Sequence, residues 1–105
     1  MEYAIYQINV ERDHDRKMFR PLGRDEYEVD STIYDKVYEG SDMSSSTYDM
    51  LEDLFQKFNI ARPDDFRGRS MSVSDVVVIN NKYPYYCDTI GWKEVFFDVR
   101  KAGER

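Results

Sequence analysis

The feature that most constrains the fold is the run Val76–Ile79, four β-branched residues with no polar residue between them. A strand with one face in water alternates apolar and polar residues, whereas an unbroken Val/Ile run is typical of a strand buried on both faces. Asn80 and Asn81 follow the run, and both tolerate the positive backbone φ of a tight turn. The sequence therefore predicts a central strand that turns back into a partner strand over residues 82–88.

Other segments with strand character lie on either side of this run. Residues 3–10 alternate, which predicts a half-buried strand. Residues 32–40 are rich in Tyr, Ile and Val but contain an Asp-Lys pair, so we expect them at a sheet edge. Residues 92–99 follow a glycine and are expected to form a last strand or a short helix. Residues 100–105 are polar, and we expect this tail to fray.

The segment 46–59 shows the clearest helical pattern. Its apolar stripe recurs at three- and four-residue spacing. The stripe consists of Tyr48, Leu51, Leu54, Phe55 and Phe58. Ser46 is expected to cap the first turn, with Asp49 completing a capping box, and Asn59 is expected to end the helix in the left-handed conformation.

The segment "RPDDFRGRSMSVSD" joins this helix to the central strand. Pro63 fits the first position of a helical turn, which would carry Phe66 inward. Ser72 and Asp75 have the Ser-x-x-Asp spacing of a cap, so a second short turn is expected before the strand. Each of these residues thus has a conformational role at its position.

Together these elements predict the α+β class, with one main amphipathic helix on one face of a small antiparallel or mixed β-sheet of about four to five strands. A chain of 105 residues supports one domain, 1–105, with a core of about 3–99. Its single cysteine, Cys87, excludes an internal disulfide and fits a reducing compartment. No segment resembles a signal peptide or a membrane span, so we expect a cytoplasmic protein.

The net charge of −6 is unevenly distributed. Residues 25–53 include ten acidic residues and one basic residue, Lys36. The acids are Asp25, Glu26, Glu28, Asp30, Asp35, Glu39, Asp42, Asp49, Glu52 and Asp53. An acidic domain repels nucleic-acid phosphates, so direct nucleic-acid binding is disfavoured and a basic protein surface is the favoured partner. The alternative is that the acidity serves only solubility.

No catalytic or cofactor motif is present in the sequence. Cys87 and His14 are the one Cys/His pair, but Cys87 lies in an apolar strand pattern and His14 in a charged segment. Zinc and calcium spacings and phosphate-binding glycine motifs are missing, so we expect no metal and no cofactor. Secondary candidates for partner contact are Arg67, Arg69, Tyr85, Tyr86 and Trp92.

Four stretches, "IYQI", "YDKVYEG", "LEDLFQKFNIARPDDFRGRSMSVSDVVVI" and "YYCDTIGWKEV", resemble the YodL-like domain family. Members of this family occur on bacterial conjugative and other mobile elements, often beside antirestriction genes. The resemblance carries over no enzymatic activity, cofactor or catalytic residue. Relatives tend to have His where this chain has Arg62 and Arg69, so any metal or proton-transfer role of those histidines could not be shared here.

The resemblance and the acidity lead to three hypotheses. The first is a non-enzymatic interaction module of mobile-element origin that inhibits a host defence protein, of anti-CRISPR or antirestriction type, through an acidic surface that mimics DNA. The second is a module that modulates another host protein, cytoskeletal or replicative, through aromatic contacts. The third is an enzyme that uses Cys87.

Overall fold

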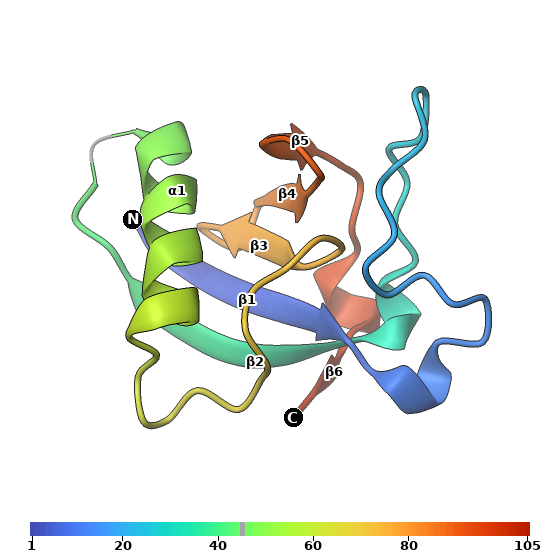
Figure 1. Ribbon diagram of the computed structural model, residues 1–105, viewed down its shortest axis with the longest axis horizontal. Helices are drawn as coiled ribbons and strands as arrows, with labels where there is room; N and C mark the ends of the chain where they lie inside the picture. Colours follow the sequence, from blue (N-terminus) through green and yellow to red (C-terminus); the bar gives the residue numbers. More distant parts are fainter. Residues whose placement is uncertain (45) are drawn as a thin grey trace.

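The computed structural model describes residues 1–44 and 46–105, which form a six-stranded sheet and one α-helix (Figure 1). The strands are β1 (Glu2–Ile8), β2 (Tyr34–Ser41), β3 (Val76–Ile79), β4 (Tyr83–Cys87), β5 (Trp92–Glu94) and β6 (Gly103–Glu104). Their order is β5-β4-β3-β1-β2-β6, and only the β2–β6 pair is parallel. The predicted α+β class is confirmed, but the sheet has six strands instead of four to five.

The centre of the sheet forms where the apolar run predicts it. β3 lies between β4 and β1, and all four of its residues are buried. The turn after β3 also forms as predicted, with Asn80 at φ 53° and Asn81 at φ 56°. This local agreement follows from chemistry that the sequence shows directly: two-sided burial needs apolar side chains, and the tight turn needs residues that tolerate positive φ.

β1 is buried on both faces, so the prediction of a half-buried strand is wrong. Tyr3 and Ile5 pack beneath the helix, whereas Tyr6 and Ile8 belong to the core on the opposite face. The reason is the position of β1, which pairs with β2 on one side and with β3 on the other. A strand at the middle of a sheet that is covered on both faces has no solvent side.

The helix α1 (Thr47–Ile60) covers one face of the sheet. Ser46 caps it as predicted, because its side chain accepts a hydrogen bond from the Asp49 amide. The buried stripe differs from the predicted one: it consists of Met50, Leu51, Leu54 and Phe58. Tyr48 is 62% exposed, and Asn59 lies inside the helix, where its side chain donates to the Phe55 carbonyl at 2.8 Å. In the described part of the chain, no helix is both long and apolar enough to cross a membrane.

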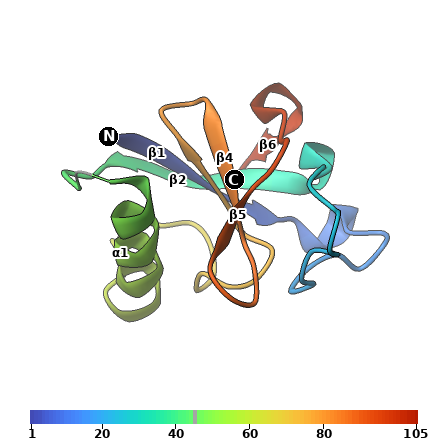
Figure 2. The ribbon, with the colours of Figure 1, turned by 90° about the horizontal axis from the view of Figure 1, so that it is seen from above.

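Irregular chain covers the face of the sheet opposite α1 (Figure 2). This chain includes three short 3-10 turns, η1 (Val10–Arg12), η2 (Ser31–Ile33) and η3 (Val99–Lys101). Met18, Leu22 and Val29 pack here from the long connection between β1 and β2. Phe97 adds edge-to-face contacts, with ring centroids 5.0 Å from Tyr6 and 5.2 Å from Tyr34. The sheet therefore has two separate cores, one under the helix and one under loops.

The tail 100–105 is ordered, in contrast to the predicted fraying. β6 runs parallel to β2, and the Arg105 amide donates to the Lys36 carbonyl at 3.0 Å. The Lys36 ammonium also pairs with Glu104 at 3.3 Å. β2, expected at a sheet edge, is thus one strand in from it. Backbone pairing with β2 gives these polar residues a partner that composition alone does not reveal.

The connector 61–75 forms the two turns that its sequence predicts. The Phe66 amide donates to the Pro63 carbonyl at 3.1 Å, and the Phe66 ring packs against Phe58 with centroids 4.9 Å apart. At the second turn the Asp75 amide donates to the Ser72 carbonyl at 3.1 Å. This turn delivers Asp75 directly to the start of β3.

Candidate functional site

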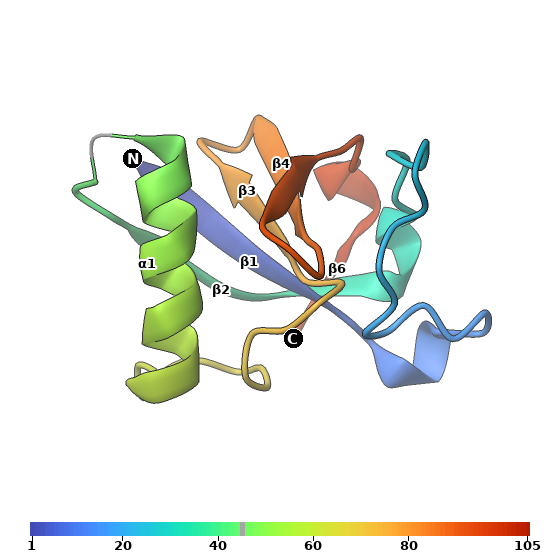
Figure 3. The same ribbon diagram turned by 45° about the horizontal axis from the view of Figure 1, so that its top comes forward.

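The acidic section 25–53 does not form one continuous surface. Residues 20–30 and α1 lie at opposite ends of the long axis of the molecule, and β2 carries the chain from one end to the other (Figures 1 and 3). The acids therefore divide into a loop-side group and a helix-side group. The loop-side group is Asp25, Glu26, Glu28 and Asp30, and the helix-side group is Glu39, Asp42, Asp49, Glu52 and Asp53.

Asp35 lies between the two groups and is buried. Arg12 donates to its Oδ1 at 2.6 Å and Asn9 to its Oδ2 at 2.8 Å, while the Arg105 Nε lies 3.9 Å away. Burial alone would raise the pKa of Asp35, but the hydrogen bonds from Arg12 and Asn9 hold it below its ordinary value. This carboxylate is enclosed by the fold, where it faces η1 and the tail, and it does not form part of an exposed acidic surface.

The helix-side group is partly engaged within the molecule. Asp42 is half-buried, and hydrogen bonds from Ser44 lower its pKa. Glu39 is exposed but pairs with Lys36 at 3.1 Å. The exposed members on the outer face of α1 are Asp49, Glu52 and Asp53. Asp53 also accepts a hydrogen bond from the Ser44 hydroxyl at 3.2 Å. Three carboxylates on one outer helix face are what an ordinary solvent-facing helix shows.

An exposed pair of aromatic rings lies beside the loop-side group. Tyr27 is 51% exposed and Phe96 is 68% exposed, with ring centroids 6.0 Å apart. Backbone hydrogen bonds fix the pair, because the Phe96 amide donates to the Tyr27 carbonyl at 2.7 Å and the Val29 amide to the Phe96 carbonyl at 3.0 Å. We call this set the acidic–aromatic surface: Asp25, Glu26, Tyr27, Glu28, Asp30 and Phe96.

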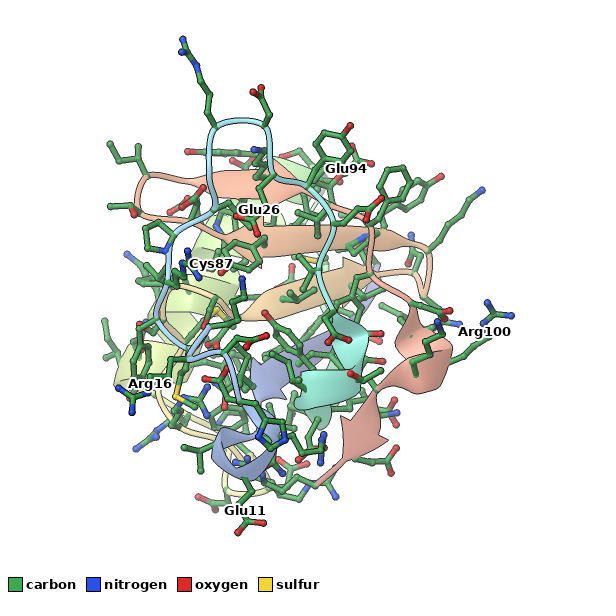
Figure 4. All side chains as sticks on the ribbon, turned by 90° about the vertical axis from the view of Figure 1, so that its right-hand side faces the viewer. Glu11, Arg16, Glu26, Cys87, Glu94 and Arg100 are labelled. Atoms are coloured by element: carbon green, nitrogen blue, oxygen red, sulfur yellow. The ribbon has the colours of Figure 1, made fainter. Side chains whose placement is uncertain are left out.

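The carboxylates of the acidic–aromatic surface are without salt bridges to any described residue. Glu26 accepts a hydrogen bond from the Gly23 amide at 2.9 Å, and Asp30 caps η2 through the Thr32 amide at 3.0 Å. Figure 4 shows Glu26 together with Glu94 on this side of the molecule. The surface thus combines carboxylates that form no salt bridge within the described chain with exposed apolar area, and the Lys93 ammonium lies near it, 3.4 Å from the Gly23 and Arg24 carbonyls.

The secondary candidates are less available for contact. Tyr86 is buried, and its hydroxyl donates to the Arg20 carbonyl. Tyr85 and Trp92 are half-buried and pack against the helix-side core. Arg67 is exposed, with its amide donating to the Val37 carbonyl at 3.3 Å. None of these residues belongs to the acidic–aromatic surface.

Cys87 does not have the environment of a nucleophile. It is buried at the end of β4, and burial raises the pKa of its thiol to about 12. A reactive cysteine needs the opposite shift, which a nearby cation or a helix N-terminus supplies. His14 is exposed in the loop after η1. Across residues 1–44 and 46–105, no three His, Cys, Asp or Glu side chains are grouped to hold a metal ion.

A buried polar centre, formed by Gln7, Arg69 and Asp75, lies at the point where the connector meets the sheet. The Gln7 amide group donates to the Arg69 carbonyl at 2.8 Å and to Asp75 Oδ2 at 3.0 Å, and its oxygen accepts from the Arg69 amide at 3.0 Å. Asp75 Oδ2 also accepts from the Ser72 amide at 2.9 Å. Asp75 is completely buried. The Ser-x-x-Asp spacing predicts the turn but not the burial, and sequence reasoning missed this centre.

The charged groups of the polar centre are buried, but several of their polar atoms lack a hydrogen-bond partner. Asp75 Oδ1 has no hydrogen-bond partner among the described residues, nor do the Nε and Nη2 atoms of Arg69. The nearest approach between the two charges, Arg69 Nη2 to Asp75 Oδ1, is 3.9 Å. Burial raises the pKa of Asp75 to about 7, although the hydrogen bonds from Ser72 and Gln7 and the charge of Arg69 oppose the rise. The carboxyl therefore changes charge near neutral pH.

These features define a small α+β domain in which one polar centre ties a connector to the sheet and a separate polar surface faces outward. The chain belongs to the YodL-like domain family, whose family model matches residues 2–97. The match includes every strand except β6 and confirms the resemblance seen in the sequence. Comparison with curated proteins and with solved structures gives no match.

Proposed function

We propose that this YodL-like domain is a non-enzymatic protein-interaction module that binds a basic surface of a host protein through its acidic–aromatic surface. The observation that supports the proposal is the exposed Tyr27–Phe96 pair, held in place by backbone hydrogen bonds and adjoined by carboxylates without salt bridges in the described chain. Exposed aromatic residues supply most of the binding energy at many interfaces. Uncompensated charge beside them steers a partner of opposite sign.

The partner class that we propose is a nucleic-acid-binding enzyme of host defence, of the CRISPR or restriction type, which the domain inhibits. The basic groove of such an enzyme attracts closely spaced negative charges, and the loop-side carboxylates offer them without a nucleic acid. The mobile-element origin that the family resemblance implies agrees with this role. The loop-side group is favoured over the helix-side group because the exposed Tyr27–Phe96 pair adjoins it and because Glu39 of the helix-side group is already in a salt bridge with Lys36.

A second candidate function rests on the aromatic pair alone. In that case the domain modulates another host protein, cytoskeletal or replicative, and Tyr27 and Phe96 contribute the binding energy without a large electrostatic part. The two functions differ in how binding depends on salt. Screening at 0.5 M salt weakens contacts between exposed charges strongly, whereas burial of aromatic rings is little affected.

The test begins with affinity purification from a host lysate at low and high salt, followed by binding measurements on the partner that is recovered. Three variants separate the surfaces: Asp25→Lys/Glu26→Lys/Glu28→Lys, Asp49→Lys/Glu52→Lys/Asp53→Lys, and Tyr27→Ala/Phe96→Ala. We expect the loop-side reversal to weaken binding at least about tenfold, because it replaces attraction with repulsion. The helix-side reversal is the matched control and should bind as the wild type does.

The outcome of these measurements decides between the candidates. Wild-type affinity in the loop-side reversal would contradict the acidic mechanism. Loss of binding confined to the Tyr27→Ala/Phe96→Ala variant, with little salt dependence, would establish the aromatic alternative. Loss confined to the helix-side reversal would move the contact to the outer face of α1, where Tyr48 is also exposed.

A further inference from the structure

The contacts of Arg69 place its guanidinium between the interior and the surface. Nη1 donates to the Ile8 carbonyl at the end of β1 at 3.1 Å. The guanidinium lies over the Phe19 ring, 5.6 Å from its centroid, and Phe19 is 55% exposed. The Nε and Nη2 atoms point away from water and have no partner among the described residues, although Asp75 Oδ1 lies 3.9 Å from Nη2. Arg69 is therefore close to two favourable partners, the buried Asp75 carboxylate and the exposed Phe19 ring.

The turn that presents Asp75 is fixed by several hydrogen bonds of Ser74, which restrict the movement of Asp75 toward Arg69. Ser74 is buried and has φ 86°, a conformation that is rare for a residue other than glycine. Its carbonyl accepts from the Tyr34 hydroxyl at 2.6 Å, its hydroxyl accepts from the Phe19 amide at 3.0 Å, and its amide donates to the Cys87 carbonyl at 2.9 Å. A strained residue persists where its surroundings fix it, and such strain clusters at switching sites. The mobile member of the pair is thus the Arg69 side chain.

We propose that Asp75 and Arg69 form a proton-operated latch within the connector 61–75, and that the inward position of Arg69 also holds the connector to the end of β1 through its hydrogen bond to the Ile8 carbonyl. When the Asp75 carboxylate is ionised, it holds the guanidinium inward. When the carboxyl is protonated, Arg69 turns outward along Phe19 to the surface. The latch is a property of the fold itself and does not depend on the proposed binding function.

The two states follow from the different requirements of the two charges. A buried carboxylate without a countercharge is unfavourable, so ionisation of Asp75 favours closing the 3.9 Å gap to the guanidinium. Protonation removes that attraction, while Gln7 and Ser72 continue to bond the other carboxyl oxygen. Arginine remains charged at any ordinary pH, and a charged guanidinium without a buried partner is more stable in water.

The other titratable groups around the polar centre come from several elements of the fold. They are Tyr34 from β2, Tyr86 and Cys87 from β4, Asp13 from the loop after η1 and Arg105 from the tail, each close enough to act electrostatically on Asp75 or Arg69. Burial raises the pKa of Tyr34, Tyr86 and Cys87, so all three stay neutral there. Asp75 is the group in this set that operates in the window around pH 7.

The experiment follows both members of the pair by NMR from pH 5 to pH 9 in a His14→Asn background, which removes the single histidine of the chain. The Asp75 carboxyl carbon reports ionisation, and the Arg69 Nε–H signal reports the position of the guanidinium relative to the Phe19 ring. We expect both signals to titrate with one common midpoint near pH 7. Separate midpoints, or an Arg69 signal that does not change, would overturn the proposal.

Variants add a test that a merely structural contact would fail. In Asp75→Asn the Arg69 signal should not titrate, and in Arg69→Gln the Asp75 midpoint should rise by about one unit, because the nearby positive charge is lost. Asp65→Asn, an exposed carboxylate in the same connector, is the matched control and should leave both titrations unchanged. Should Asp75→Asn fail to fold, the wild-type titration and Arg69→Gln still decide the question. An Asp75 midpoint that is the same in Arg69→Gln as in the wild type would refute the latch.

Discussion

Replacing Asp75 by Asn should change how the stability of the domain depends on pH. Burial raises the pKa of Asp75 from 3.8 to about 7 in the folded state, whereas the unfolded chain keeps the ordinary value. Between these values the folded state binds more protons than the unfolded state, so the free energy of unfolding of the wild type falls as pH rises from about 4 to about 7. Asn does not titrate, and this part of the pH dependence should vanish in the variant.

The size of the effect follows from the same two values. One pKa unit corresponds to about 1.4 kcal/mol, so the shift of Asp75 removes ~4 kcal/mol of wild-type stability across the window. Asn is close in shape to the protonated carboxyl. The difference in unfolding free energy, Asp75→Asn minus wild type, should therefore increase by that amount from pH 4 to pH 8.

Urea unfolding followed through the fluorescence of Trp92, the one tryptophan, measures this difference at each pH. Asp35, Asp42 and Asp98 have lowered pKa values, so their contributions to the stability of the domain decrease toward low pH. These contributions are the same in both proteins and cancel in the difference. Asp65→Asn, at an exposed carboxylate, is the control. Parallel stability curves for wild type and Asp75→Asn between pH 4 and pH 8 would show that Asp75 is not buried as a titrating group, and the reasoning would fail.

Three further perturbations test other parts of the structure. Phe58→Ala should lower the free energy of unfolding in urea by about 3–5 kcal/mol, because Phe58 is fully buried against Tyr38 and Phe66. Tyr48→Ala, on the exposed face of α1, should change it by less than about 0.5 kcal/mol. Similar losses in the two variants would contradict the assigned helix face. Gly68→Ala should lower the stability by about 1–3 kcal/mol, since its Cβ would collide with the Gln7 side chain, while Gly23→Ala meets only ordinary contacts and serves as the control. Cys87 should react with a disulfide reagent at pH 8 at least about a hundredfold more slowly in the native protein than in urea, because burial raises its pKa to about 12; equal rates would show an accessible thiol.

The parts of the fold that follow from the sequence are those set by neighbouring residues. The unbroken run 76–79 defines a strand buried on both faces, Asn80 and Asn81 define the turn, and Ser46 defines the start of the helix. Each depends on chemistry within a few positions along the chain. The predicted buried face of the helix differs from the observed one by a small rotation about the helix axis. Tyr48 and Met50 are both apolar enough to fit the stripe, and only contact with the sheet decides that Met50 is the buried one.

The parts that sequence reasoning missed depend on partners far away in the chain. The tail forms β6 because β2 offers it a free backbone edge, and Asp75 is buried because Gln7 of β1 lies opposite. The candidate surface shows the same division. Composition identifies the acids, but the position of β2 between the loop and α1 separates them into two groups, and the pairing of Phe96 with Tyr27 joins segments that are distant in sequence.

The strand order has a consequence for how the domain acquires its structure. β1 precedes both of its neighbours in the chain, and its pairing with β3 joins Tyr3 to Ile79. Neither core can close until β3 has been synthesised. β2 can pair with one edge of β1 as soon as residue 41 has been made, but the other edge of β1, which has apolar residues on both faces, lacks its partner until residue 79. Folding that depends on such distant pairings is slow, because a large loop must close before the contacts stabilise it. We therefore expect β1 to be the segment most exposed to chaperones and to misassociation during synthesis.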